Sequence, residues 1–527
     1  YAGNLLLLPE NSRIKRDTMP VSYFRVVCVL LLCVITSCST VRERPQPGSI
    51  ASEKVKREFR GAWIQTAFQG EYKEMTPAMM RKDFIRKLDR LRACGINAII
   101  FQVRPEADAF YKSDIEPWSR FLTGEQGVAP ADGFDPMAFL IEECHKRNME
   151  FHAWLNPYRA STAGNTRFAQ SHIYHRHPEW FVTYNKQILF DPGLPECRQF
   201  ICRVVRDIVL RYDVDAIHMD DYFYPYPVAG MPFPDDKSFR KYGLRAGYTE
   251  AQRDDWRREN VNILIQELKR TILLAKPWVR FGISPFGIYR NKKSTPDGSG
   301  SDTNGLQNYD DLYADITYWV QQGWIDYNIP QIYWEIGHPA ADYITLIQWW
   351  NKNANGGHLY IGQDVARTMK ADQLTRKMRY ERALTHVKGN CFWPANEILW
   401  NNQGIADSLR RHYHRYPALI PAYTHQHDRA PKEVRRLKAE WTPEGYILHW
   451  KAQQSRTNPE LASYFVVYRF ADGEPIDISD PSKIEAITRE TRYQLPYEKG
   501  KVKYRYVVTA VDRFHNESEG KVKKVKL

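Results

Sequence analysis

The residues best suited to chemistry are two acids, Asp220 and Glu335, each at the end of a short apolar segment. Successive side chains of a β-strand point to opposite faces, so His218 and Asp220 share one face of their segment, and Ile217 and Met219 share the other. We expect the apolar pair to face covering helices. This directs His218 and Asp220 toward the interior of the fold.

Glu335 directly follows two aromatic residues, Tyr333 and Trp334. A poorly solvated site disfavours the charged form of a carboxylic acid, so we expect a raised pKa for Glu335. Cleavage of a glycosidic bond uses one carboxylate as nucleophile or charge stabiliser and a second, protonated carboxyl as acid. We therefore predict that Asp220 fills the first role and Glu335 the second.

Further polar and aromatic residues stand at the ends of other predicted strands. Arginine and amide side chains can fix a carboxylate or a sugar hydroxyl, and aromatic rings can either stack on a sugar or pack against the barrel. Glu397 is the alternative acid, and Asp221 is predicted to support or cap the loop after Asp220. The predicted substrate-binding residues are Arg104, Trp154, Asn156, His218, Asp221, Tyr222, Trp334 and Glu397.

The elements that would position these residues alternate between short apolar strands and longer amphipathic helices. Eight such units over residues 59–405 predict a (β/α)8 TIM barrel, whose active site forms at the C-terminal ends of the strands. A doubly wound open sheet is the alternative, but the glycine-rich loop expected after its first strand is absent from the sequence. The predicted strands are 61–66, 96–103, 149–155, 214–220, 279–284, 326–334, 358–362 and 389–393.

The pattern changes after the predicted barrel. Residues 406–431 are rich in proline and are predicted to form a linker. Residues 432–527 alternate with a period of two, which predicts a small all-β sandwich. The spacing of Trp450, Tyr464 and the 504–508 segment resembles fibronectin type III domains.

The first 58 residues are expected to serve export and anchoring. Arg25 precedes the apolar run 26–35, and small residues then lead to Cys38, which describes an export signal rather than a spanning helix. The end of this segment resembles a bacterial lipobox, in which the cysteine becomes the lipidated N-terminus. We therefore expect residues 1–38 to comprise upstream residues and a lipoprotein signal peptide, and 39–58 to be a tether at the bacterial cell envelope.

Composition narrows the function further. The chain has 527 residues, 43% hydrophobic and 26% charged, which excludes a mainly disordered protein. The formal net charge of +13 comes without long basic runs, so we expect no nucleic-acid partner. The cysteines lack metal-ligand spacing, and we expect neither a metal nor another cofactor.

Several motifs resemble the bacterial glycosyl hydrolase-like 10 family. They are RGAW (60–63), FQVRP (101–105), WLNPYR (154–159), IHMDDYFYP (217–225), ISPFG (283–287) and PQIYW (330–334). The resemblance implies a TIM-barrel glycosidase, distantly similar to the α-amylase clan. In that clan a basic residue precedes the nucleophilic aspartate by two positions, where this chain has His218. The clan's acid follows the fifth strand, where 284–287 offers no carboxylate.

Relatives in this family are thought to act on the glycan strands of peptidoglycan, so the resemblance implies a polysaccharide or peptidoglycan substrate. Two alternatives stay open. One is a metal-dependent hydrolase or deacetylase that uses His152, His218, Asp220 and Asp221. The other is a non-catalytic glycan-binding or scaffold lipoprotein that uses the C-terminal sandwich.

Overall fold

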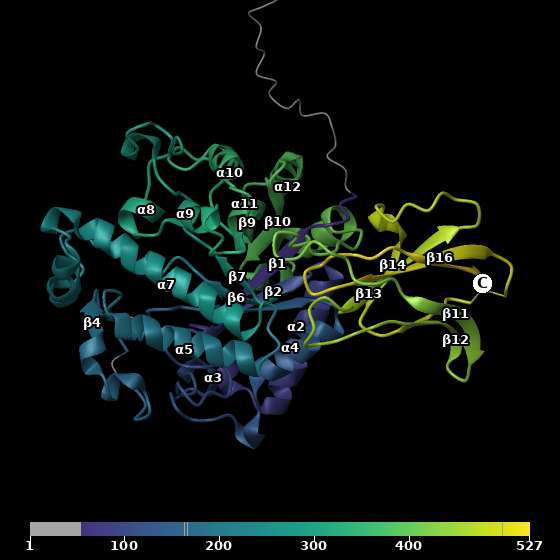
Figure 1. Cartoon of the computed structure of the whole chain (residues 1–527), viewed down its shortest axis with the longest axis horizontal. Helices are drawn as coiled ribbons and strands as arrows, with labels where there is room; N and C mark the ends of the chain where they lie inside the picture. Colours follow the sequence, from purple (N-terminus) through teal and green to yellow (C-terminus); the bar gives the residue numbers. More distant parts are fainter. Residues whose placement is uncertain (1–53, 163, 166, 498) are drawn as a thin grey trace, which may run out of the picture. The chain divides into compact units, whose positions relative to one another are not determined.

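The computed structural model describes residues 54–527 except 163, 166 and 498. Eight parallel strands close into a barrel in the order β1-β10-β9-β8-β7-β6-β3-β2, and Figure 1 shows helices around the strands. The predicted α/β fold, a (β/α)8 TIM barrel followed by an all-β region, is thus confirmed. The predicted signal peptide, Cys38 and most of the predicted tether lie outside the described residues.

All eight predicted barrel strands are present, with shifted ends. The sixth is much shorter than predicted, because only two of its residues pair as a regular strand before Pro330 interrupts the ladder. The strands are β1 (Phe59–Ile64), β2 (Ala98–Arg104), β3 (Glu150–Leu155), β6 (Ala216–Met219), β7 (Arg280–Ile283), β8 (Tyr327–Asn328), β9 (His358–Asp364) and β10 (Val387–Trp393).

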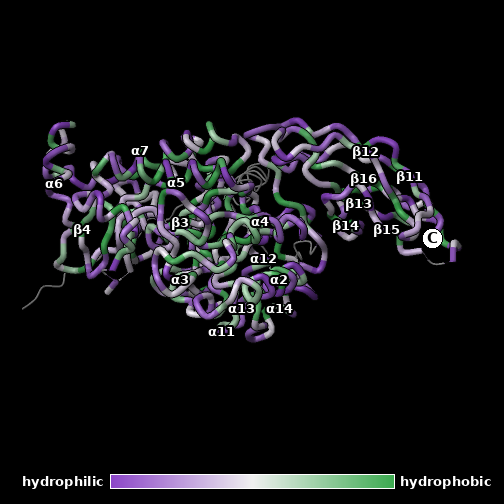
Figure 2. Tube along the Cα trace, turned by 90° about the horizontal axis from the view of Figure 1, so that it is seen from below, coloured by the Kyte–Doolittle hydropathy of each residue, from purple (hydrophilic) through white to green (hydrophobic). Residues whose placement is uncertain are grey.

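The helices around the barrel are amphipathic. Figure 2 shows hydrophobic and hydrophilic segments alternating along the tube, α5 and α7 among them, as expected where one helix face packs on strands. Each of the first three long helices begins with a proline in its first turn. The longer helices are α2 (Pro77–Ala93), α4 (Pro136–Lys146), α5 (Pro195–Arg211), α7 (Arg253–Ala275), α10 (Tyr343–Lys352) and α12 (Leu374–Ala383).

Strand β6 confirms the predicted alternation. Ile217 and Met219 belong to the apolar layer between strands and helices, and Ala216 belongs to the core inside the barrel. His218 is also inside, since it hydrogen-bonds to Tyr327 of β8, two strands away, whose ring belongs to the same interior core. The chain therefore reaches Asp220 pointing to the barrel axis.

A β-hairpin that was not predicted from the sequence follows β3. Strands β4 (Phe181–Tyr184) and β5 (Gln187–Phe190) pair antiparallel in the loop between β3 and α5. Phe190 is fully buried in the barrel's outer core. The hairpin therefore fixes the long loop beside the ends of β2 and β3.

The C-terminal region contains two antiparallel sheets. One has the order β11-β12-β15 and the other β14-β13-β16-β17, and both contribute side chains to one core that includes Leu448, Trp450, Phe465 and Val508. This arrangement is the predicted sandwich. The strands are β11 (Arg435–Thr442), β12 (Gly445–Lys451), β13 (Tyr464–Ala471), β14 (Ile484–Thr488), β15 (Arg492–Gln494), β16 (Lys503–Val511) and β17 (Lys521–Lys526).

The segment between the barrel and the sandwich is packed along much of its length. It begins inside a helical stretch, α14 (Ile405–Ser408) and η10 (Leu409–Tyr413). Leu419 then pairs with the backbone on both sides of Arg57, and Tyr423 hydrogen-bonds to Tyr360 in the barrel interior. Within residues 54–527, the described helices include none with the length and apolar character of a membrane span.

Candidate active site

A cavity of about 320 Å³ opens at the C-terminal ends of the barrel strands. Side chains from β1, β3 and β10 and from the loops after β6 and β7 border it, which is where active sites of this fold form. Two carboxylates face it, amid amide and aromatic side chains. The lining residues are Trp63, Gln65, Ala67, Phe68, Gln102, Trp154, Arg159, Asp220, Asp221, Tyr222, Ser284, Gln331, Tyr333 and Trp393.

Asp220 follows β6 and is 5% exposed. One carboxylate oxygen, Oδ2, accepts hydrogen bonds from Trp154 Nε1 at 3.1 Å and from the amide of Asn156. The other, Oδ1, receives only a long hydrogen bond from the backbone of Tyr222 at 3.4 Å. One oxygen is thus anchored by two side chains while the other is more weakly engaged.

Asp221 is the second carboxylate at the cavity. It accepts hydrogen bonds from the Tyr226 hydroxyl and, at 3.1 Å, from Gln331 Nε2. Both donors favour its ionised form. Asp221 thus contacts two neighbouring side chains, as a supporting residue would, but it also borders the cavity directly.

The two adjacent acids titrate as an interacting pair. Burial raises the pKa of Asp220 to about 7, with the negative charge of Asp221 as the second cause. Burial also raises the pKa of Asp221, against the opposing hydrogen bonds from Tyr226 and Gln331. We infer that Asp221 ionises first and that Asp220 holds a proton near neutral pH.

His218 lies one layer deeper in the barrel and is fully buried. Its Nδ1 contacts the Tyr327 hydroxyl at 3.1 Å, and its Nε2 contacts Ser284 Oγ at 3.0 Å and Trp63 Nε1 at 3.4 Å. Burial holds the pKa of His218 well below its usual range. His218 is therefore a neutral group beneath the acids, not a cation that would hold Asp220 ionised.

Arg104 acts at a distance from the cavity. Its guanidinium forms a bidentate pair with Glu116 and donates to the backbone oxygens of Asn156 and Pro157. It is 1% exposed and does not belong to the cavity lining. The structure thus places Arg104 where it holds Asn156, which in turn contacts Asp220.

Asn156 is the centre of an amide network. Its Oδ1 accepts from Gln102 Nε2 at 2.7 Å and from Arg159 at 2.6 Å, while its amide donates to Asp220. Arg159 also donates to the backbone of Pro105 and lies 5.7 Å from the centre of the Tyr222 ring. The orientation of the Asn156 amide, and so its donation to Asp220, is fixed by two further donors.

Aromatic rings surround the acids. Trp154 and Trp393 meet edge to face at 6.1 Å between ring centres, and Trp63 and Tyr333 do so at 6.5 Å. Tyr222 is 40% exposed and stacks on Tyr226 at 5.2 Å. Such rings offer flat apolar surfaces for the faces of a sugar.

Six of the ten predicted catalytic and substrate-binding residues lie outside the cavity lining: Arg104, Asn156 and His218, described above, and Trp334, Glu335 and Glu397. Trp334 packs edge to face on Phe286 at 5.4 Å. Glu335 is half-buried and is among the carboxylates that act electrostatically on Lys377. Glu397 lies in helix α13 (Ala395–Leu399) and accepts a hydrogen bond from Asn402 at 2.8 Å. The structure does not bring Glu335 or Glu397 together with Asp220.

The metal-site alternative finds little geometric support. His152 contacts the Tyr327 hydroxyl at 2.8 Å and Glu150 at 2.9 Å, so both of its nitrogens are engaged below the cavity. Among the described residues, no group of three or more His, Cys, Asp or Glu side chains could hold a metal ion.

Five polar residues that border the cavity were not predicted as site residues: Gln65, Gln102, Arg159, Ser284 and Gln331. Gln102, Ser284 and Gln331 stand at or near the ends of predicted strands, which is the signal that could have found them. Arg159 follows its strand by several residues, and only the folded loop returns it to Asn156.

Comparison with known proteins places the chain in a family. Residues 58–378 match the family model described as Glycosyl hydrolase-like 10. The chain is 40% identical to Glycosyl hydrolase YngK of Bacillus subtilis over 490 residues, which cover 89% of this chain and 94% of that protein. It is 38% identical to Glycosyl hydrolase DigH of Escherichia coli over 366 residues, which cover 64% of this chain and 81% of that protein.

Among solved structures, the PgaB (BpsB) glycoside hydrolase domain from Bordetella bronchiseptica aligns with a TM-score of 0.44 and 10% identity. The alignment covers 67% of this chain and 98% of that one. The matched family model spans more than half of the chain and includes every strand of the barrel except β10. By this match and by its two relatives, the chain belongs to the glycosyl hydrolase-like 10 family.

Proposed function

We propose that this protein hydrolyses O-glycosidic bonds in a polysaccharide, with Asp220 as the proton donor. The observation that carries the proposal is the pair Asp220 and Asp221 facing an aromatic-lined cavity at the C-terminal mouth of a TIM barrel. A pKa near 7 lets Asp220 hold a proton at neutral pH, which a general acid requires. This role differs from the one expected from the sequence, where Asp220 was the nucleophile or charge stabiliser.

In the proposed reaction the proton on Asp220 passes to the bridging glycosidic oxygen as the bond from that oxygen to the anomeric carbon breaks. The negative charge of Asp221 faces the positive charge that develops on the sugar ring. Water adds its hydroxyl to the anomeric carbon, and its remaining proton restores Asp220. Trp154 and Asn156 hold Oδ2 of Asp220, which leaves Oδ1 to carry the proton.

The substrate we propose is the glycan strand of peptidoglycan, in keeping with the family resemblance. The aromatic rings around the acids suit the faces of sugar rings. Within this proposal the protein is an exported lipoprotein anchored at the cell envelope through Cys38. Metabolic labelling with a radioactive fatty acid tests the anchor, because the label should disappear from Cys38→Ser.

The activity is tested with peptidoglycan stripped of its peptides and with a panel of polysaccharides, with products identified by mass spectrometry. Asp220→Asn should lower kcat by roughly 10²–10⁴-fold, the usual contribution of a positioned general acid. Asp221→Asn should also lower it. Glu335→Gln is the matched control, since that carboxylate lies outside the cavity, and it should keep more than a third of the rate.

Wild-type rates in Asp220→Asn would overturn the proposed acid. A large loss in Glu335→Gln would restore Glu335 as the catalytic acid. Glycan binding without any product from the wild-type protein would instead support the scaffold alternative, with the C-terminal sandwich as the binding module.

A further inference from the structure

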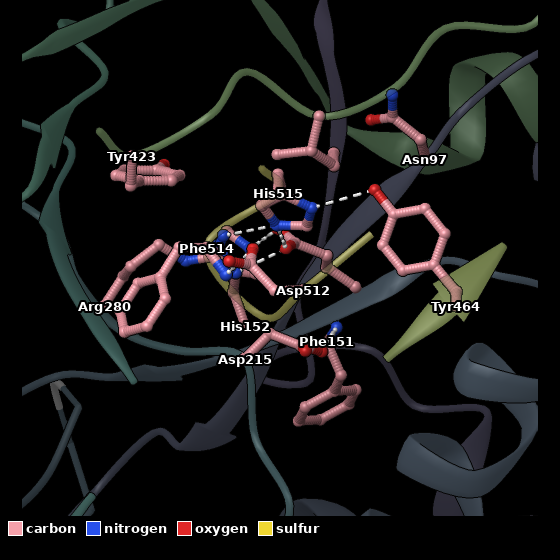
Figure 3. Close-up of polar contacts among 12 residues, drawn as sticks. Asn97, Phe151, His152, Asp215, Arg280, Tyr423, Tyr464, Asp512, Phe514 and His515 are labelled. Carbon is pink, nitrogen blue, oxygen red and sulfur yellow. Dashed lines mark hydrogen bonds and ion pairs between the residues drawn. The ribbon is translucent and has the colours of Figure 1, made fainter. Parts of the chain in front are cut away.

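The loop between β16 and β17 of the sandwich places a histidine against the floor of the barrel. His515 is buried, and its Nε2 lies 2.7 Å from Glu150 Oε1 at the start of β3. Figure 3 shows His515 at the centre of this contact, with a dashed line from its Nδ1 to the Tyr464 hydroxyl, a distance of 3.1 Å. The sandwich thus contributes a side chain to the polar interior of the barrel.

Glu150 is the acceptor at which several hydrogen bonds meet. Oε1 accepts from Arg280, and Oε2 accepts from His152 Nε2 at 2.9 Å. His515 Nε2 contacts both members of the Arg280–Glu150 pair, at 2.9 Å from an Arg280 guanidinium nitrogen and 2.7 Å from Glu150 Oε1. The Arg280 charge, followed by His515, holds the pKa of Glu150 well below its usual range, against the effect of burial. Glu150 is therefore ionised, and an ionised carboxylate can only accept hydrogen bonds.

This acceptor sets the direction of every bond above it. His152 must carry its proton on Nε2 to donate to Glu150, so its Nδ1 accepts from the Tyr327 hydroxyl at 2.8 Å. The Tyr327 oxygen then accepts from His218 Nδ1 at 3.1 Å. A neutral His218 protonated on Nδ1 has an unprotonated Nε2.

At the end of this hydrogen-bond chain nearest the cavity, a second contact independently requires the same donor and acceptor directions. Trp63 Nε1 is a donor only, and it points at His218 Nε2. A proton on His218 Nε2 would place two N–H groups against each other. His218 Nε2 is therefore the acceptor for Trp63 and for the Ser284 hydroxyl, and both of these residues line the cavity that holds Asp220.

We propose that His515 of the sandwich is a positioning residue for the active site. It contacts both Arg280 and Glu150 and so holds this ion pair in place, and Glu150 fixes the hydrogen-bond directions through His152, Tyr327 and His218 to Ser284 and Trp63. The sandwich is then an integral part of the barrel's interior rather than an appended module. The effect on catalysis rests on the proposed function, whereas the hydrogen-bond directions do not.

The directions are tested by NMR on protein labelled with ¹⁵N in its histidine rings, in which long-range ¹⁵N–¹H spectra distinguish the two tautomers. The His218 signals are assigned by their loss in His218→Gln. In the wild-type protein His218 should be the Nδ1–H tautomer. An Nε2–H tautomer there would overturn the proposal without any further variant.

The role of His515 is tested by His515→Ala and His515→Gln. The alanine variant loses the side chain that contacts both Arg280 and Glu150, so the position of Glu150 should change and the His218 signals should shift, and kcat should fall about tenfold with KM within twofold. The glutamine variant keeps a polar side chain with both a donor and an acceptor and should recover kcat to within threefold. If the alanine variant does not fold, His515→Phe fills the same space without a polar atom and takes its place.

The matched control is Asp213→Asn. It weakens the ion pair of 2.9 Å between Asp213 of the barrel and Arg513, two residues before His515, without touching the hydrogen-bond chain. This variant should keep wild-type spectra and kcat. Equal effects in Asp213→Asn and His515→Ala would overturn the proposal in favour of general domain contact, and so would wild-type spectra in His515→Ala. If the wild-type protein hydrolyses no glycan, the proposed function fails but the NMR outcome still decides the hydrogen-bond chain.

Discussion

The mouth and the floor of the barrel each bury a carboxylic acid to a similar extent, but the pKa of the acid is raised at the mouth and lowered at the floor. Asp220 at the mouth is 5% exposed and Glu150 at the floor is 6% exposed. Burial raises the pKa of Asp220 to about 7, while the pKa of Glu150 lies well below its usual range. Desolvation is common to both, so the difference comes from their partners.

The partners of Asp220 are neutral donors beside a second carboxylate, whereas Glu150 meets the Arg280 guanidinium directly. A buried acid with a hydrogen-bonded cation is a fixed charge that organises its neighbours. A buried acid without one can exchange a proton near neutral pH. The barrel therefore keeps its fixed charge at the floor and its titrating group at the mouth.

The largest effect on stability is expected when the cation is removed from the floor. Arg280→Met leaves Glu150 buried and uncompensated, so the free energy of unfolding at pH 7 should fall by about 3–5 kcal/mol. Chemical denaturation measures this change. The double variant with Glu150→Gln should regain most of the loss, and a double variant as unstable as Arg280→Met would contradict the explanation.

The pH dependence at the floor has a definite sign. Glu150 has a lowered pKa in the folded state, so its stabilising contribution is present above its unfolded pKa and is lost as the pH falls below it. The deficit of Arg280→Met should accordingly shrink in acid, where Glu150 is protonated in both states. A deficit that is independent of pH would indicate lost packing instead.

The mouth should respond to substitution in the opposite sense. Asp220 has a raised pKa, so as the pH rises from about 4 to about 7 the unfolded chain releases this proton while the folded protein retains it, and stability falls. Asp220→Asn removes this penalty and should raise the free energy of unfolding at pH 8 by roughly 2–4 kcal/mol. At pH 4 the two proteins should differ little, and a destabilised Asp220→Asn at pH 8 would contradict the assignment.

A smaller effect, on the pKa of Asp220, is expected when one hydrogen-bond donor at the mouth is removed. Trp154→Phe keeps an aromatic ring but removes the N–H that bonds to Asp220 Oδ2. This bond favours the ionised acid, so its loss should raise the pKa of Asp220 by about one unit. The alkaline limb of the pH–rate profile should move upward by the same amount.

Trp63→Phe is the matched control for that profile. Trp63 borders the same cavity, but its indole donates to His218 rather than to Asp220. The alkaline limb of the pH–rate profile of Trp63→Phe should stay within about 0.3 pH unit of the wild-type profile. A downward shift in Trp154→Phe, or equal shifts in both variants, would show that Trp154 does not tune Asp220.

The sequence predicts the fold and the orientation of β6 because both follow from local periodicity. The alternation of Ile217, His218, Met219 and Asp220 is enough to place Asp220 inside, and the structure agrees. Arg104 is different, because its partner Glu116 lies in a loop that no periodicity describes. An arginine at a strand end cannot be identified as a site residue or a supporting residue until its loop partner is known.

Glu335 is the opposite case, a residue that its local sequence predicted at the site but that lies outside the cavity lining. Its aromatic neighbours predicted a place at the site, but β8 ends early and the chain after Pro330 is irregular. In this segment Gln331 and Tyr333 border the cavity, whereas Trp334 and Glu335 do not. His515 lies in another region of the chain, 365 residues from Glu150 in sequence, and no local pattern relates the two. Contacts of this kind appear only when the whole chain has folded.

The closed order of the barrel has a consequence for how the chain folds. Strand β1 pairs with β10, and at the same seam Arg382 hydrogen-bonds to Glu58, 324 residues away in sequence. Until β10 is available, β1 is an open sheet edge that can recruit strands from other molecules. Closure over so long a loop is slow, because chain entropy must be lost before the contact forms. The interval before the seam closes is therefore when this protein should depend most on chaperones and be most prone to aggregate.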